Sequence, residues 1–174
     1  MEKLSSEVIL NDARLKVIKD EVQLPNGKNS TYVRLAPTTN HSVIVIAIDP
    51  RKRILLQKEY SYPPNKVMWQ LPGGSMKNKE SVETAALREL SEESGYSAKS
   101  TKILGYFYTH NRLSDQKQYI VQCTDLFNRK LPEDEDELIE NYWVTKNQLV
   151  HKITSNEFHN INLLAALNIW FINR

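Results

Sequence analysis

A group of three glutamates lies close together near the middle of the chain. Glu89 and Glu92 are three residues apart and Glu89 and Glu93 are four apart, which places the three carboxylates on one face of an α-helix. Carboxylates at these spacings repel one another, which costs helix stability. Because no lysine is interleaved among the three glutamates, we expect no cation between their side chains. The pattern predicts a site for a hard divalent cation, Mg²⁺ or Mn²⁺, which oxygen ligands suit. A solvated acidic face is the alternative, and the helix alone does not decide between the two.

The residues around this acidic group have the signals of one well-defined helix. Ser81 is a suitable N-cap, Glu83 lies favourably in the first turn, and Gly95 is a natural C-terminal stop. Every fourth residue in between is apolar, which predicts a stripe that packs on a sheet: Val82, Ala86 and Leu90. Before the helix, Gly73 and Gly74 allow the backbone to approach closely, so that a main-chain carbonyl can join the carboxylates.

The segments on both sides of the helix have the patterns of strands. Apolar-rich runs over 15–24 and 30–35 flank Asn26-Gly27, and Asn-Gly between two such runs predicts an antiparallel hairpin. Further strands are predicted over 43–48, 53–58, 102–108, 117–122 and 140–144, and two closing helices near Thr145 and Asn160. Strands before and after one helix, without regular βαβ alternation, predict an α+β fold with a mixed sheet.

The composition is that of an ordinary globular domain. Of the 174 residues, 40% are hydrophobic and 25% are charged, and this length fits one domain. The net charge of +2, with dispersed basic residues, gives no strong field for gathering nucleic acid. Cys123, the single cysteine, lies in an apolar run and is expected to be a buried core residue, so neither a disulfide nor a cysteine-based zinc site is predicted.

Neither end of the chain has the pattern of a targeting or membrane segment. The first ten residues lack a basic segment followed by an apolar stretch, so no secretory signal is expected. The longest apolar segment, over 161–171, is too short to span a bilayer and has the spacing of a core-facing helix. A cytoplasmic protein without a membrane partner is therefore expected.

The loop and the helix together resemble the Nudix box, which reads Gly, five residues, Glu, seven residues, Arg-Glu-apolar-any-Glu-Glu-any-Gly-apolar. The residues in register with it are Gly74, Glu80, Arg88, Glu89, Leu90, Glu92, Glu93 and Gly95. Tyr96 is an aromatic residue where an aliphatic one is usual. The resemblance implies a Nudix-type α/β/α sandwich with a mixed central sheet and an N-terminal antiparallel hairpin. It also implies a pyrophosphohydrolase that uses Mg²⁺, with Mn²⁺ as a substitute, and a metal-activated water.

The same resemblance implies a role for each residue of the box. The metal ligands would be Glu89, Glu92, Glu93 and the carbonyl of Gly73. The residues that keep the box rigid would be Gly74, Glu80, Arg88 and Gly95, with Arg88 and Glu80 forming a pair. The catalytic base of such enzymes usually comes from a mobile acidic loop downstream of the box, and residues 133–137 occupy that place. Glu137 aligns best with the base, Glu135 is next, and Glu92 is a further catalytic candidate.

Nearly the whole chain resembles one branch of this family, the ADP-ribose and nucleoside-diphosphate-sugar pyrophosphatases. In that branch the early strands form a dimer whose partner helps to bind the nucleobase. Residues 1–40 are therefore the expected dimerisation element of a homodimer, and residues 41–174 its catalytic domain. Tyr32 and Arg14 take the base-stacking role by position, because both have flat faces that can sandwich a purine. An ordinary strand aromatic is the alternative for Tyr32.

Three departures from the branch concern the substrate. Ser61 stands where an arginine usually grips the diphosphate, Gln70 replaces a common glutamate, and Asn111 replaces a typical proline. Lys58 or Arg112 is the expected substitute, since the loss of a guanidinium fork is not neutral for phosphate recognition. ADP-ribose, cut to AMP and ribose 5-phosphate, is the leading substrate. The alternatives are other nucleotide sugars, nucleoside triphosphates, dinucleoside polyphosphates, and a sensor that binds a nucleotide sugar without cutting it.

Overall fold

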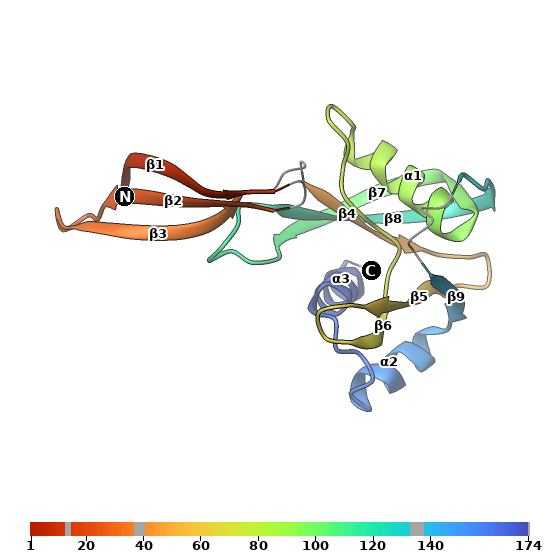
Figure 1. Ribbon diagram of the computed structural model, residues 1–174. Helices are drawn as coiled ribbons and strands as arrows, with labels where there is room; N and C mark the ends of the chain where they lie inside the picture. Colours follow the sequence, from red (N-terminus) through yellow and green to blue (C-terminus); the bar gives the residue numbers. More distant parts are fainter. Residues whose placement is uncertain (13–14, 37–40, 133–137, 174) are drawn as a thin grey trace.

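The computed structural model describes residues 1–12, 15–36, 41–132 and 138–173. Within these residues the elements in chain order are β1 (Glu2–Asn11), β2 (Lys16–Gln23), β3 (Asn29–Ala36), β4 (Ser42–Ala47), β5 (Ile54–Ser61), β6 (Lys66–Gln70), α1 (Val82–Ser94), β7 (Tyr96–Tyr108), β8 (Lys117–Asn128), β9 (Ile139–Val144), α2 (Lys146–Thr154) and α3 (Ile161–Ile172). Figure 1 shows a layered body that contains the three labelled helices, and a narrow sheet of β1, β2 and β3 that projects from it.

Two sheets form the middle of the body. In one the order is β4-β8-β7, with β4 parallel to β8 and β8 antiparallel to β7, which confirms the predicted mixed sheet. In the other the order is β6-β5-β9, and both pairs are antiparallel. A bridge between Ile48 and Ile54 connects the end of β4 to the start of β5. The sequence patterns do not predict β6, because its run of 5 residues is too short for a clear alternation.

Strand β4 separates two apolar clusters. Ile44 and Ile46 pack into a cluster with residues of α2 and α3, whereas Val43 and Val45 pack into a cluster with residues of α1. Successive residues of a strand point to opposite faces, so this apolar strand is buried on both sides. Leu90 of the predicted helix stripe is fully buried in the second cluster. Figure 1 shows α1 on one side of β4 and α3 on the other, which is the predicted α/β/α order of layers.

The helix ends agree with the predicted caps. Ser81 Oγ accepts the backbone N–H of Thr84 at 3.1 Å, and Gly95 ends α1 in the left-handed region with a φ of 73°. That backbone conformation favours glycine, which explains the stop. Thr145 and Asn160 cap α2 and α3 through their side chains. In the described ranges, no helix has both the length and the apolar character needed to cross a bilayer.

The predicted N-terminal hairpin is confirmed, and its turn is longer than two residues. β2 and β3 are antiparallel, and Gln23 lies opposite Asn29. The Gly27 N–H donates to the Leu24 carbonyl at 2.9 Å, and Gly27 has a positive φ of 80°. Pro25 has no N–H to donate across a two-residue Asn26-Gly27 turn, and Asn26 has no positive φ, so the chain makes a longer turn that ends in a left-handed glycine. A two-residue Asn-Gly turn is therefore not formed.

A third N-terminal strand, β1, is absent from the sequence prediction. It pairs antiparallel with β2 and is exposed along its whole length. Its register with β2 shifts between Lys3 and Ser5 and again between Val8 and Leu10, so no clean alternation of polar and apolar residues marks it. The large apolar side chains that remain exposed on this N-terminal sheet include Leu4, Val8, Ile9, Leu10 and Val33.

Candidate active site

The segment before α1 lies along the edge of β4. The Val43 N–H donates to the Gly74 carbonyl at 2.9 Å, and the Val45 N–H donates to the Pro72 carbonyl at 2.7 Å. Gly73 lies between these bonds with a φ of 154°, and a Cβ atom built on it would be 2.3 Å from the Val43 carbonyl oxygen. Only glycine permits this approach, so Gly73 is what allows the loop to lie against the sheet.

Two of the helix carboxylates meet this loop. A Cβ atom on Gly74 would lie 2.6 Å from Glu89 Oε1, so the glycine leaves the space that the carboxylate fills. Glu93 Oε2 accepts the Gly73 N–H at 3.1 Å. Glu89 and Glu93 are only 8% and 9% exposed, and acidic residues are rarely so buried unless they are paired or hydrogen-bonded. The loop and α1 therefore hold both carboxylates in a largely dehydrated place.

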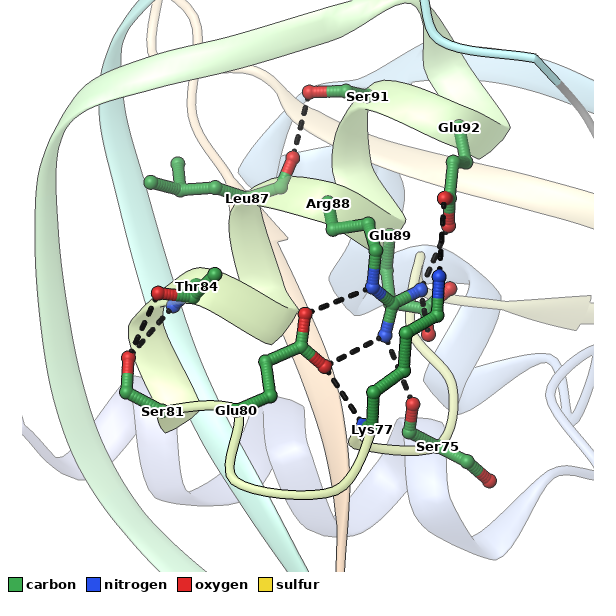
Figure 2. Close-up of polar contacts among 10 residues, drawn as sticks. All are labelled: Ser75, Lys77, Glu80, Ser81, Thr84, Leu87, Arg88, Glu89, Ser91 and Glu92. Atoms are coloured by element: carbon green, nitrogen blue, oxygen red, sulfur yellow. Dashed lines mark hydrogen bonds and ion pairs between the residues drawn. The ribbon is translucent and has the colours of Figure 1, made fainter.

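Arg88 connects most of the acidic residues of the motif (Figure 2). Its Nε and Nη2 donate to the two oxygens of Glu80 at 2.9 and 3.0 Å, and Nη2 also donates to the Ser75 carbonyl at 2.9 Å. Its Nη1 lies 2.7 Å from Glu92 Oε2 and 2.9 Å from Glu89 Oε1. The expected pair of Arg88 and Glu80 is therefore present, and through Ser75 it attaches the loop to the helix.

The expectation that no cation lies among the helix carboxylates is wrong. Arg88 directly precedes Glu89 and lies four residues before Glu92, so its long side chain can reach both. The Lys77 ammonium group adds a second positive charge, 4.0 Å from Glu92 Oε1, on a mostly exposed side chain. Among the described residues, the Arg88 guanidinium and the Lys77 ammonium group lie beside the carboxylates of Glu80, Glu89 and Glu92, so three carboxylates face these two cations.

The charge states follow from these contacts. The hydrogen bonds from Arg88 hold the pKa of the Glu80 carboxyl below its ordinary value, and the same bonds raise the pKa of Arg88 above its own. Both groups therefore stay charged at neutral pH. The acidic oxygens in excess are the ligands that Mg²⁺ and Mn²⁺ prefer. As they stand, no three His, Cys, Asp or Glu side chains of the described ranges form a ready cage for an ion.

Two predicted substrate residues lie together in a groove on the N-terminal sheet. The groove has a volume of about 450 Å³, and Tyr32, Arg112 and Asn111 all line it. Asp20 and Arg34 line the same groove and are missing from the sequence prediction. Arg34 could have been found, because it is two residues after Tyr32 and a strand repeats its direction every second residue. Asp20 could not have been found from the sequence, since only the register of β2 and β3 places it opposite Tyr32.

Lys58 lies on another side of the molecule. Its Nζ is 4.8 Å from the centroid of the Trp69 ring and 5.3 Å from that of Tyr142. On the same strand, Leu55 packs into the cluster with α1 and Leu56 into the cluster with α2 and α3. Strand alternation puts Lys58 on the side of Leu56, so β5 separates it from the carboxylates of α1.

Three predicted site residues lie outside the described part of the chain, whereas Cys123 lies within it. Arg14, Glu135 and Glu137 lie outside the described residues. Cys123 is buried in the cluster with α1, and burial raises the pKa of its thiol to about 12. A buried thiol that stays protonated is chemically inert, so Cys123 is the core residue that the sequence predicts.

Comparison with known proteins identifies the class to which the chain belongs. The family model of the NUDIX domain matches residues 38–167, well over half of the chain. The chain is therefore a member of the Nudix family, and it is a Nudix hydrolase. The segment from Gly74 to Gly95, with its glycine loop, helix and paired acids, is the Nudix box of this protein.

Particular relatives match nearly the whole chain. An ADP-ribose pyrophosphatase of Bacillus subtilis (strain 168) is 28% identical over 166 residues, 94% of this chain and 89% of the relative. The ADP compounds hydrolase NudE of Escherichia coli (strain K12) is 27% identical over 170 residues, 96% of this chain and 91% of the relative. A crystal structure of an ADP compounds hydrolase has a TM-score of 0.88 at 24% identity and covers 96% of this chain and 90% of that one. The predicted Nudix-type α+β fold is thus confirmed.

Proposed function

We propose that this Nudix hydrolase cuts the diphosphate bond of ADP-ribose, or of a closely similar nucleotide sugar, and releases AMP and ribose 5-phosphate. The observation that carries the proposal is the pair of buried carboxylates, Glu89 and Glu93, that meet the Gly73-Gly74 loop. The ADP-ribose pyrophosphatase of Bacillus subtilis, which matches 94% of this chain, supports the choice of substrate.

The reaction is proposed to need Mg²⁺, with Mn²⁺ as a substitute, because the acidic oxygens in excess fit a hard cation. The proposed ligands are Glu89, Glu92, Glu93 and the Gly73 carbonyl. Bound Mg²⁺ would neutralise charge on the diphosphate and lower the pKa of a water molecule. Arg88 contacts one oxygen of Glu89 and one of Glu92, and a bound cation would compete with it there, while its bonds to Glu80 and to the Ser75 carbonyl would keep the loop on the helix.

The proposed general base comes from the acidic residues between β8 and β9. Glu137 is the first candidate, Glu135 the second and Glu92 a further one. The base takes a proton from the attacking water, and no covalent intermediate is needed. Asn141 of β9 donates a hydrogen bond to the Glu93 carbonyl at 2.9 Å, so the strand that follows the acidic residues is attached to the helix that carries the carboxylates.

The nucleobase is proposed to bind in the groove of the N-terminal sheet, with Tyr32 and Arg14 as its contacts, and Arg112 of the same groove is proposed to contact the diphosphate. Figure 1 shows this sheet projecting away from α1. We therefore propose a homodimer in which residues 1–40 form the dimerisation element, residues 41–174 form the catalytic domain, and the second copy brings its groove to the carboxylates. The exposed apolar side chains of β1 to β3 support an interface there. Neither nucleic acid nor a membrane is proposed as a partner.

The deciding experiment identifies products. The full chain is incubated with Mg²⁺ and, separately, with ADP-ribose, other nucleotide sugars, nucleoside triphosphates and dinucleoside polyphosphates. We expect equal amounts of AMP and ribose 5-phosphate from ADP-ribose, with a kcat/KM at least about tenfold above that for the other classes. Chelation of the metal should abolish turnover. Inorganic pyrophosphate released from triphosphates as the main product would overturn the proposal, and binding of ADP-ribose without any product would indicate a sensor.

A matched pair of variants separates loss of a ligand from damage to the helix. Glu89→Gln removes the charge of a proposed ligand, whereas Glu83→Gln removes the charge of an exposed glutamate in the first turn of the same helix. We expect Glu89→Gln to lose turnover and Glu83→Gln to keep it. Equal losses in both variants would mean that helix stability, not metal binding, explains the result.

A further inference from the structure

Three amide side chains form one row across β6, β5 and β9. Gln57 of β5 lies opposite Gln70 of β6 and opposite Asn141 of β9. Residues directly opposite each other in antiparallel strands project to the same face, so the three amides share one face of this sheet. Leu55, two residues before Gln57, packs into the cluster with α1. The row therefore lies on the face that is directed to the Nudix helix.

Hydrogen bonds lead from this row to one of the proposed metal ligands. Gln57 Nε2 donates to Asn141 Oδ1 at 3.3 Å, and Asn141 Nδ2 donates to the Glu93 carbonyl at 2.9 Å. The carboxylate of Glu93 in turn accepts the Gly73 N–H at 3.1 Å. Glu93 is thus held at two points, at its backbone by β9 and at its side chain by the glycine loop.

Gln57 is a costly residue for a purely structural position. It has no exposed surface, and its Oε1 has no hydrogen-bond partner among the described residues. Its neighbours Leu55 and Leu56 are also fully buried, so an apolar residue of similar shape would suit the packing better. The useful part of this amide is its Nε2 donor, which sets the orientation of Asn141.

We propose that Asn141, oriented by Gln57, is a positioning residue for Glu93. By donating to the backbone carbonyl of Glu93 in the last turn of α1, Asn141 fixes the position of the Glu93 carboxylate relative to Gly73. It also joins the C-terminal end of the helix to β9. The inference rests on the proposed metal-dependent function, in which Glu93 is a ligand. Groups that orient a metal ligand in this way commonly change metal affinity by about ten- to a hundredfold when they are removed.

The test compares the parent chain with Asn141→Leu and with the double variant Gln57→Leu/Asn141→Leu. Mn²⁺ affinity is measured by electron paramagnetic resonance, thermal unfolding by calorimetry, and kcat and KM over a range of Mg²⁺ concentrations. We expect Asn141→Leu to weaken Mn²⁺ binding about tenfold or more. The kcat at low Mg²⁺ should fall in parallel and recover at high Mg²⁺, while KM for the nucleotide sugar changes less than about twofold.

The double variant distinguishes positioning from simple packing. Replacing both amides by leucine removes the Gln57 amide atoms that Asn141→Leu alone leaves unpaired, so the unfolding temperature of the double variant should rise above that of Asn141→Leu. The weak Mn²⁺ binding should remain, because Glu93 still lacks its donor. Recovery of both stability and Mn²⁺ affinity in the double variant would overturn the inference, since the pair would then serve packing alone.

A control variant tests whether any buried amide would give the same result. Gln118 of β8 also has a buried Oε1 without a partner among the described residues. It lies two residues before Ile120, on the side of the sheet that is covered by α2 and α3. Gln118→Leu should leave Mn²⁺ affinity unchanged, and an equal loss there would contradict the inference. If the parent chain neither binds Mn²⁺ nor cuts any substrate, the proposed function fails instead.

Discussion

The layered body and the N-terminal sheet of this chain are stabilised in different ways. In the body, Val43, Val45 and Leu90 have no exposed surface and pack between layers of the same chain. In the N-terminal sheet, Val8 and Val33 are each 51% exposed, and the single buried residue of β1, β2 and β3 is an acid, Asp20. A sheet of this kind buries little apolar surface by itself, so its strands must be joined mainly by polar contacts.

Asp20 provides the polar contacts that join the three N-terminal strands. Its carboxylate accepts the Ser6 hydroxyl at 2.5 Å and the Arg34 Nε at 2.6 Å, so one residue of β2 binds both β1 and β3. The hydrogen bond from Arg34 is the main reason why the pKa of Asp20 is lowered from its ordinary value. The body therefore carries its own stability, whereas the sheet has specific internal contacts and exposed apolar surface that is available to a partner.

The largest expected effect is in the body. Glu93→Gln keeps an oxygen that can accept the Gly73 N–H but removes the charge that a metal ligand needs. We expect turnover to fall at least about a thousandfold, equivalent to about 4 kcal/mol of barrier. Sedimentation should show an unchanged oligomeric state, because the sheet is untouched. Steady-state kinetics with ADP-ribose measure the loss, and a variant with near-normal kcat at all Mg²⁺ concentrations would contradict the proposed ligand.

The next effect concerns the proposed base. Glu137→Gln should lower kcat at least about a hundredfold, because a general base contributes that much or more. Binding of ADP-ribose, measured by calorimetry with Ca²⁺ in place of Mg²⁺, should stay nearly intact. Glu135→Gln is the matched comparison. A full loss there, together with a normal Glu137→Gln, would assign the role to Glu135.

A smaller effect on the stability of the body is expected from Arg88→Lys. Lysine keeps the charge but loses the fork that binds Glu80 and Ser75, so the free energy of unfolding at pH 7 should fall by about 2 kcal/mol. The pKa of the Glu80 carboxyl is lower in the folded chain than in the unfolded chain. The ion pair therefore stabilises the fold fully at a pH above the unfolded-state pKa, and this stabilisation is lost as the pH falls through the folded-state pKa. The difference between parent and variant should therefore shrink at acidic pH. Urea unfolding at pH 7 and pH 4 measures it, and a constant difference would contradict this account.

The smallest expected effect tests the sheet. Val33→Glu places a charge on its exposed apolar surface, and we expect the dissociation constant of the dimer to rise at least about tenfold. KM should rise with it, because the groove is proposed to serve the other copy, while the unfolding temperature of the body stays the same. Val150→Glu, on an exposed valine of α2, is the control. Equal dissociation constants in Val33→Glu and the parent would remove the sheet as the interface.

Local patterns account for the elements that sequence reasoning predicts correctly. The limits of α1 follow from Ser81 and Gly95, whose effects reach only a few residues along the chain. Strand β4 follows from an unbroken apolar run. By contrast β1, with two shifts of register, has no such run, and its pairing with β2 is visible only in three dimensions.

The contacts of individual side chains are harder to predict from the sequence than the helices and strands. Arg88 is expected to pair with Glu80 and does so, but its bonds to Glu89 and Glu92 contradict the expected acidic group without a cation. The role of Lys58 or Arg112 at the diphosphate stays a prediction, and in the structure the Lys58 side chain lies beside Trp69. The i,i+4 spacing of Arg88 and Glu92 already allows their contact, whereas the direction of the Lys58 side chain depends on the strand in which it lies.

By itself the sequence determined the limits of the Nudix helix, the N-terminal hairpin, the buried strands and the resemblance to the family. These follow from caps, periodicity and motif spacing, which are interactions among residues close together in the chain. Only the tertiary structure decided that Gln57 and Asn141 hold Glu93 and that a groove forms on the sheet away from α1. Those contacts join distant segments, and their register depends on how complete sheets and helices pack against one another.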